Sequence, residues 1–184
     1  MRIIGGSAGG RRFTPPGNMP HTRPTTDVAK EGLFNVIENN LEIDSLKVLD
    51  LFGGTGSISY ELASRGCSDI TTVEKDQKMF SFISSNARSL GFNQIRAVKM
   101  DVFQYIHQCK DQYSFIFAGP PYALAAIDEL PVEIFKYQLL LPNGWFILEH
   151  TPRNDYTSFP YYRTTRKYGT TLFSIFINSI PGEQ

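Results

Sequence analysis

The sequence lacks the features that staple small secreted proteins or place a protein in a membrane. Its 184 residues include only two cysteines, Cys67 and Cys109, which lie far apart and show no Cys-x-x-Cys spacing. This pattern excludes a disulfide scaffold, and we expect no metal site. No apolar run approaches the ~18 residues that a membrane-spanning helix needs, and the N-terminus lacks the apolar stretch of a signal peptide. We therefore expect a cytoplasmic protein.

The chain also lacks net charge, because 18 lysines and arginines balance 18 aspartates and glutamates. The distribution is uneven, however. Residues 1–26 contain four arginines and no acid, and a second small basic cluster lies at 163–167. The neutral total weakens the case for a nucleic-acid partner, and the basic ends keep that case open. With 41% hydrophobic and 20% charged residues, the composition is ordinary for one globular domain.

Segments typical of strands and helices alternate along most of the chain. Apolar stretches predict strands at 46–51, 69–74, 94–98, 113–118, 145–149, 163–167 and 171–178. Amphipathic patterns predict a helix that begins after Thr26 or Asp27, and further helices at 57–65, 76–90, 102–109 and 126–140. Strands joined by helices pair in parallel, whereas the last two strands have no helix between them and should pair antiparallel. The prediction is an α/β protein with a doubly wound, mostly parallel seven-stranded sheet.

Residues 1–25 precede this pattern and are expected to form an N-terminal appendage to the domain at 26–184. Short apolar pieces around paired glycines at 1–14 predict a small β-hairpin or a loose arm, and four prolines between 15 and 25 predict a loop. An acid-free segment rich in Arg and Gly is better suited to ordering on RNA than to packing in a core. The alternative is a solvated arm with no partner.

A glycine-rich turn, Gly53-Gly54-Thr55-Gly56, follows the first predicted strand. Glycines let the backbone approach a ligand closely, and the helix behind them offers free N–H groups. The dinucleotide-binding fingerprint fails, because Ser59 occupies its third glycine position. Asp50 near the end of the strand would repel a phosphate and attract an ammonium group, such as that of S-adenosylmethionine. A generic tight turn between strand and helix is the structural alternative.

Two further acids follow the second and third strands. Glu74 lies about twenty residues after the glycine turn, where a carboxylate can bind both hydroxyls of a ribose. The alternative is an ordinary solvated acid before a helix. Asp101 could accept a hydrogen bond from an adenine amino group, with the Val102 N–H facing a ring nitrogen, or it could cap the next helix. Asp101 could fill both roles, adenine binding and helix capping, at once.

The fourth strand leads into Gly119-Pro120-Pro121-Tyr122. Consecutive prolines restrict the backbone and leave carbonyl groups without local N–H partners, and the aromatic ring after them can stack on a flat base. Such a segment alone could be an ordinary turn or a proline-rich ligand. Its place at the carboxyl end of a strand, near the glycine turn, favours a catalytic loop.

These motifs resemble the class I S-adenosylmethionine-dependent methyltransferases that act on amino groups. The ends of the chain narrow the resemblance to the RsmD family, bacterial enzymes that methylate the exocyclic N2 of a guanine in 16S ribosomal RNA. The specific matches are Arg2-Ile3-Ile4-Gly5-Gly6, Gly10-Arg11-Arg12, Arg23-Pro24-Thr25-Thr26-Asp27, Asp50 through Ser57, Ser64-Arg65-Gly66 and Arg166-Lys167-Tyr168-Gly169. The similarity covers nearly the whole chain.

The resemblance implies roles for individual residues. The cofactor-binding residues would be Asp50, Phe52, Gly53, Gly54, Thr55, Gly56, Glu74, Lys75, Asp101 and Val102. The catalytic loop would be Gly119, Pro120, Pro121 and Tyr122, and the residues that contact RNA phosphates would be Arg2, Arg11, Arg12 and Arg23. The partner would be 16S rRNA or the small ribosomal subunit, including its assembly intermediates, and the enzyme is expected to be a monomer.

One residue departs from the family pattern. The family loop reads Asp-Pro-Pro-(Tyr/Phe), and this chain has Gly119 in place of the aspartate. In the family that carboxylate and the carbonyl of the next proline accept hydrogen bonds from the guanine amino group. Loss of one such polar group typically costs about a hundred- to a thousand-fold in rate. We therefore expect cofactor and RNA binding to persist, and catalysis to be weak or absent.

Three other functions are compatible with parts of the sequence. Methyltransferases of DNA adenine or protein glutamine share the Pro-Pro-Tyr loop, although the arginine-rich N-terminal block favours ribosomal RNA. A non-catalytic module that binds S-adenosylmethionine and ribosomal RNA is consistent with Gly119. A dehydrogenase is the weakest alternative, given Asp50 and Ser59.

Overall fold

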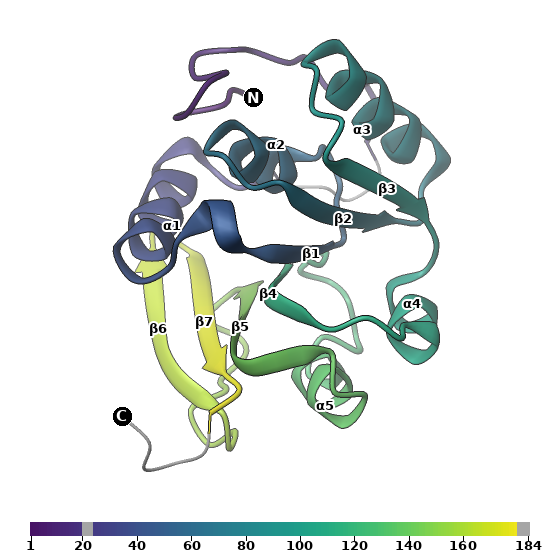
Figure 1. The fold of residues 1–184 in the computed structure, drawn as a ribbon. Helices are drawn as coiled ribbons and strands as arrows, with labels where there is room; N and C mark the ends of the chain where they lie inside the picture. Colours follow the sequence, from purple (N-terminus) through teal and green to yellow (C-terminus); the bar gives the residue numbers. More distant parts are fainter. Residues whose placement is uncertain (20–23, 180–184) are drawn as a thin grey trace.

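The computed structural model describes residues 1–19 and 24–179. Their centre is a seven-stranded sheet with the order β3-β2-β1-β4-β5-β7-β6, flanked by helices on both faces (Figure 1). The strands are β1 (Lys47–Leu51), β2 (Asp69–Glu74), β3 (Ile95–Lys99), β4 (Tyr113–Ala118), β5 (Leu140–His150), β6 (Tyr162–Tyr168) and β7 (Thr171–Ile177). The helices are α1 (Asp27–Asn40), α2 (Ser57–Ser64), α3 (Gln77–Ser89), α4 (Val102–Gln108) and α5 (Glu129–Lys136), with a short 3-10 turn, η1 (Ile43–Ser45). The predicted fold class is confirmed.

The pairing of the strands follows from the connections between them. β1 to β5 are joined by helices and pair in parallel, with β1 between β2 and β4. β7 pairs antiparallel with both β5 and β6, as the absence of a helix between the last two strands predicted. The strands after β1 are therefore added on one side of it (β2, β3) and then on the other (β4, β5). Sheets of this kind bind ligands where this order switches, between β1 and β4.

Alternating apolar side chains along the strands build a core on each face of the sheet. One core lies under α1, α2 and α3, where Val48, Phe115 and Ile147 meet Leu33 and Ile58. The other lies under α4 and α5, where Leu49, Ile116 and Phe146 meet residues of those helices. Because neighbouring residues of a strand point to opposite faces, the continuous apolar runs of β1, β4 and β5 serve both cores.

Side-chain caps mark the N-termini of three of the helices. The side chains of Thr26, Asp76 and Asp101 accept hydrogen bonds from the first turns of α1, α3 and α4. α5 is much shorter than the predicted helix at 126–140. Pro131 has no N–H to donate, so it must lie in the first turn, and Gln138 takes a left-handed φ of 55° just after the helix.

The N-terminal arm, residues 1–14, is packed against the domain, so the expectation that it would not pack in a core is wrong. Arg2 and Arg12 pair as an antiparallel bridge, and Ile3 donates to the carbonyl of Arg11, which makes the arm hairpin-like. The Ile3 side chain is 1% exposed and belongs to the core under α1 and α2.

A buried ionic network holds this arm. Glu61 on α2 accepts from the backbone N–H groups of Ile4 (2.9 Å) and Gly5 (2.8 Å), and its Oε2 lies 3.5 Å from the Lys30 ammonium. Lys30 in turn donates to the carbonyl of Arg2. Both charged side chains are almost completely buried, and burial lowers the pKa of Lys30.

Across the two ranges that the structure covers, no helix has the length and apolar character needed to cross a bilayer.

Candidate active site

The site is built at one edge of the sheet. Because β1 to β5 run in parallel, their carboxyl ends lie along the same edge. An acidic residue lies near the carboxyl end of four of these strands, and Gly119 follows the other, β4. The acidic residues are Asp50, Glu74, Asp101 and Glu149.

The glycine turn between β1 and α2 requires small residues at two positions. A Cβ on Gly53 would lie 2.5 Å from the Thr72 hydroxyl on β2, and a Cβ on Gly56 would lie 2.6 Å from the Tyr60 ring. Gly56 also has a left-handed φ of 80°, as has Phe52 with a φ of 61°. The turn therefore lies tightly against β2, and its backbone rather than its side chains forms this side of the site.

Asp50 is buried behind the turn. Its Oδ2 accepts a hydrogen bond of 2.6 Å from the hydroxyl of Ser59 on α2, and its side chain is 1% exposed overall. Burial raises the pKa of Asp50 to about 7, against the opposing effect of the Ser59 hydroxyl. Ser59, which breaks the dinucleotide fingerprint, thus has a defined structural role. A cation placed beside Asp50 would favour its ionised form.

Glu74 joins the glycine turn to the start of α3. Its Oε2 accepts from the N–H of Gly54 and its Oε1 from the N–H of Asp76, both at 2.8 Å. Glu74 is therefore not the simple solvated acid that the sequence also allowed. A carboxylate has about four acceptor positions, so two remain for further donors such as ribose hydroxyls. Lys75 beside it is exposed.

Asp101 is the N-cap of α4. Its Oδ1 accepts from the N–H groups of Phe103 (2.9 Å) and Gln104 (3.2 Å), which confirms the capping role. The suggested hydrogen bond to an adenine amino group remains a prediction. The side chain of Val102 is buried, so it is the backbone of this residue that can face a ligand.

These residues fit a nucleoside that carries an amino-acid tail. The side chains along the edge are carboxylates, which would repel a phosphate but can accept hydrogen bonds from an ammonium, from ribose hydroxyls and from an adenine amino group. Within the described part of the chain, no group of three or more His, Cys, Asp or Glu side chains could hold a metal ion.

The loop after β4 brings a tyrosine to a cavity. Gly119 donates its N–H to the carbonyl of Leu51 (3.3 Å), which places the loop beside the glycine turn. The Tyr122 hydroxyl donates to Glu149 Oε1 (2.9 Å) and lies 3.5 Å from the Thr171 hydroxyl. Next to Tyr122 is a cavity of about 260 Å³ between the start of α1 and the turn joining β6 to β7. Its lining includes a second aromatic residue, Tyr168.

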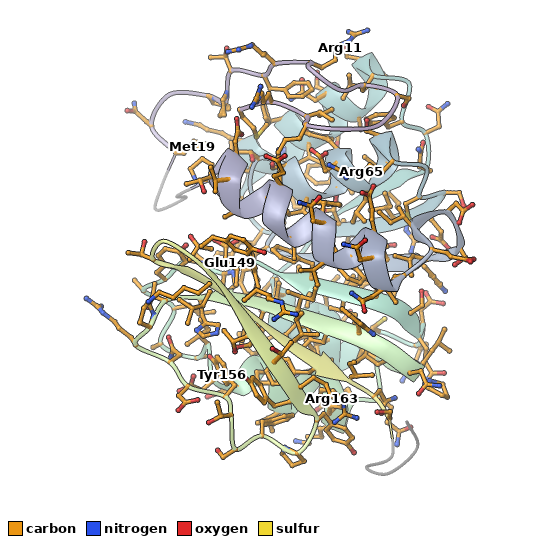
Figure 2. The ribbon with its side chains drawn as sticks, turned by 90° about the vertical axis from the view of Figure 1, so that its left-hand side faces the viewer. Arg11, Met19, Arg65, Glu149, Tyr156 and Arg163 are labelled. Carbon is orange, nitrogen blue, oxygen red and sulfur yellow. The ribbon has the colours of Figure 1, made fainter. Side chains whose placement is uncertain are left out.

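Glu149 is the residue that the sequence reasoning missed. It lies near the end of β5, is 4% exposed, and accepts from the hydroxyls of Thr25 (2.7 Å) and Tyr122. Burial raises its pKa. Figure 2 shows Glu149 where α1 and the β6–β7 pair come together. Its signal in the sequence was the one used for Asp50 and Glu74, an acid at the carboxyl end of a parallel strand.

The arginines assigned to RNA differ in their surroundings. Arg2 forms an ion pair of 2.7 Å with Asp27, at the start of the helix that borders the cavity. Arg11 and Arg12 are exposed on the arm, and Arg23 lies outside the described residues. In Figure 2, Arg11 and Arg163 appear at opposite ends of the view. Arg11 of the first basic cluster therefore lies far from Arg163 of the second.

Comparisons with known proteins agree with this geometry. The model of a family described as "Conserved hypothetical protein 95" matches residues 1–177. YlbH of Bacillus subtilis, named as an rRNA methyltransferase, is 34% identical over 82% of both chains. Ribosomal RNA small subunit methyltransferase D of Escherichia coli is 30% identical over 79% of this chain and 69% of its own length. The solved structure of yhhF from E. coli, titled a methyltransferase, superposes with a TM-score of 0.85 at 23% identity, covering 97% and 98% of the two chains.

Proposed function

Because the chain belongs to the RsmD family of methyltransferases, described also as conserved hypothetical protein 95, we propose that it methylates small-subunit ribosomal RNA at the exocyclic N2 of a guanine. The methyl donor is S-adenosylmethionine, which supplies a methyl group on a positively charged sulfur. The observation that supports this most directly is the meeting of three strand-end carboxylates with the Pro-Pro-Tyr loop at one edge of the sheet. Because ribosomal RNA is the substrate in this proposal, we infer that the protein acts in the cytoplasm.

The cofactor would be held by the residues at the ends of the first three strands. Asp50 binds the ammonium of its amino-acid tail, Glu74 the ribose hydroxyls, and Asp101 with the Val102 N–H the adenine. The turn from Phe52 to Gly56 lets the backbone approach. Lys75 lies next to the ribose-binding acid and is exposed.

The target base would enter the cavity beside Tyr122. A guanine flipped out of its helix can stack on the Tyr122 ring, with its amino group turned toward the carbonyl of Pro120. The cavity has a volume of about 260 Å³, and Arg2 of the arm pairs with Asp27, which lies between two of its lining residues, Thr26 and Val28. Fixed orientation of the amino group toward the methyl donor would supply much of the rate.

The test is methyl transfer from labelled S-adenosylmethionine to RNA, followed by mass-spectrometric mapping of the modified base. The substrates are free 16S rRNA, partly assembled small subunits and complete small subunits, with DNA and a protein glutamine substrate as controls. A single N2-methylguanine in one of the three RNA substrates is the expected result. Label in DNA adenine or in protein would contradict the proposal. Size-exclusion chromatography with light scattering tests the expected monomer.

A further inference from the structure

The space in front of Gly119 is already faced by a carboxylate. A Cβ built on Gly119 would lie 3.7 Å from Glu149 Oε2 and 3.1 Å from the Phe117 ring. The carboxylate of an aspartate at position 119 would therefore be a direct neighbour of the Glu149 carboxylate. Glu149 comes from β5, the strand that pairs in parallel with β4, so the two positions lie side by side at the same edge.

No positively charged side chain of the described residues forms an ion pair with Glu149. Its two oxygens accept from the hydroxyls of Thr25 and Tyr122. A buried acid without a cation is costly for stability, and such groups gather at functional sites. Each oxygen keeps an acceptor position beyond the hydroxyl that it binds.

We propose that Glu149 is a catalytic residue, which accepts a hydrogen bond from the guanine amino group in place of the acid absent at position 119. This inference rests on the proposed function. The amino nitrogen uses its lone pair to form the bond to the methyl carbon, and the carbon–sulfur bond breaks with its electron pair remaining on sulfur. The amino group then loses one proton, which Glu149 accepts and releases to water. The carbonyl of Pro120 provides the second acceptor.

The inference replaces the expectation that catalysis is weak or absent. That expectation left the Pro120 carbonyl as the remaining acceptor, because the sequence does not show that Glu149, near the end of β5, lies beside Gly119, just after β4. Glu149 also binds the hydroxyl of Tyr122, so the acceptor and the stacking ring are held together.

The experiment is a double-mutant cycle with the wild-type chain, Glu149→Gln, Gly119→Asp and the double variant, assayed on the mapped RNA substrate. We expect Glu149→Gln to lower kcat by about a hundred- to a thousand-fold. Gly119→Asp should recover at least tenfold of that loss in the Glu149→Gln background and change the wild-type rate much less. Affinity for S-adenosylhomocysteine, measured by calorimetry, should stay within about twofold in all four proteins.

A binding measurement tests the same contact without catalysis. With S-adenosylhomocysteine present, wild-type protein should bind RNA carrying the target guanine several-fold more tightly than RNA with inosine there, because inosine lacks the amino group. Glu149→Gln should remove this preference, and the double variant should restore it. Tyr122→Phe should cost less than Glu149→Gln, because it removes a hydroxyl from Glu149 and leaves the carboxylate. Glu42→Gln, an exposed site remote from the loop, is the matched control.

The outcomes separate the two proposals. Equal rates and equal guanine preference for wild type and Glu149→Gln overturn the role of Glu149 while the proposed function stands. Activity only in the proteins that carry Gly119→Asp would also overturn the role of Glu149 and leave the proposed function standing. A loss in Tyr122→Phe equal to that in Glu149→Gln shows that Glu149 only positions Tyr122, and overturns the inference. Methyl transfer by none of the proteins overturns the proposed function and this inference with it.

Discussion

Asp50 and Glu149 are both buried carboxyl groups near strand ends, and burial raises the pKa of each. Asp50 could be predicted from the sequence because the glycine turn that follows it is a recognisable motif. Glu149 also lies near the carboxyl end of a strand, but no recognisable motif follows it. Its importance depends on contacts with Gly119 and Tyr122, which the sequence does not show. Chemistry that depends on two strands lying side by side needs the three-dimensional structure.

The pKa of Asp50 predicts a proton-linked binding step. In the free protein this pKa is about 7, and an ammonium group bound nearby would lower it. Binding of S-adenosylhomocysteine should therefore release a proton near pH 6.5, and its affinity should rise with pH, by up to about tenfold per unit below pH 7. Calorimetry in two buffers of different ionisation enthalpy measures the released proton. Asp50→Asn should release none, and the same proton count in both proteins would contradict this assignment.

The stability of the free protein should change with pH in the opposite direction to the ligand affinity. As the pH rises from 3.8 toward about 7, the unfolded state ionises Asp50 while the folded state keeps the buried carboxyl protonated, so the free energy of unfolding falls over that range. Asp50→Asn should flatten this part of the pH profile of stability.

At the scale of elements, β2 and β4 could be predicted to the residue, because apolar runs bounded by polar residues set their ends. β5 is longer than the predicted 145–149. It starts at Leu140 and passes an irregularity in its pairing with β4, with Asn143 at a φ of 62°, before Trp145 resumes the register. Such irregularities follow from the fit between strands, which periodicity does not encode.

The packing of the N-terminal arm is also an element-scale property, and it makes a prediction about stability. Glu61→Gln leaves the Lys30 ammonium buried without its charge partner, which should destabilise the fold by about 3–5 kcal/mol. Hydrogen exchange of the Ile4 and Gly5 amides should accelerate, because they donate to Glu61. Glu38→Gln, which removes only the half-exposed partner of Arg65, is the matched control and should cost about 0–1 kcal/mol. Denaturant unfolding that ranks the two variants equally would be inconsistent with a buried anchor.

The arm also carries the exposed charges expected to contact RNA. If Arg11 and Arg12 each neutralise a phosphate, replacing both with glutamine should make the negative slope of log affinity against log salt shallower by about 1.5. The control is Lys136→Gln on α5, which covers the other face of the sheet. RNA-binding titrations over a range of salt give both slopes. An unchanged slope in the double arginine variant would leave the arm as a structural element only.

At the scale of the whole molecule, the order of the seven strands explains why one edge carries the site. β1 and β4 lie at the centre, so the glycine turn and the Pro-Pro-Tyr loop meet, and β2 and β5 add Glu74 and Glu149 on either side. The cofactor residues then lie toward β2 and β3, and the base cavity toward β5 and β7. Methyl donor and acceptor would approach each other across the ends of β1 and β4.

The most direct test of this arrangement is a crystal structure with bound S-adenosylhomocysteine. We predict that the ligand lies across the carboxyl ends of β1, β2, β3 and β4, with its ammonium beside Asp50, its ribose hydroxyls on Glu74 and its sulfur facing the loop at Gly119. Density for the ligand at another place, or none at this edge under saturating conditions, would contradict it.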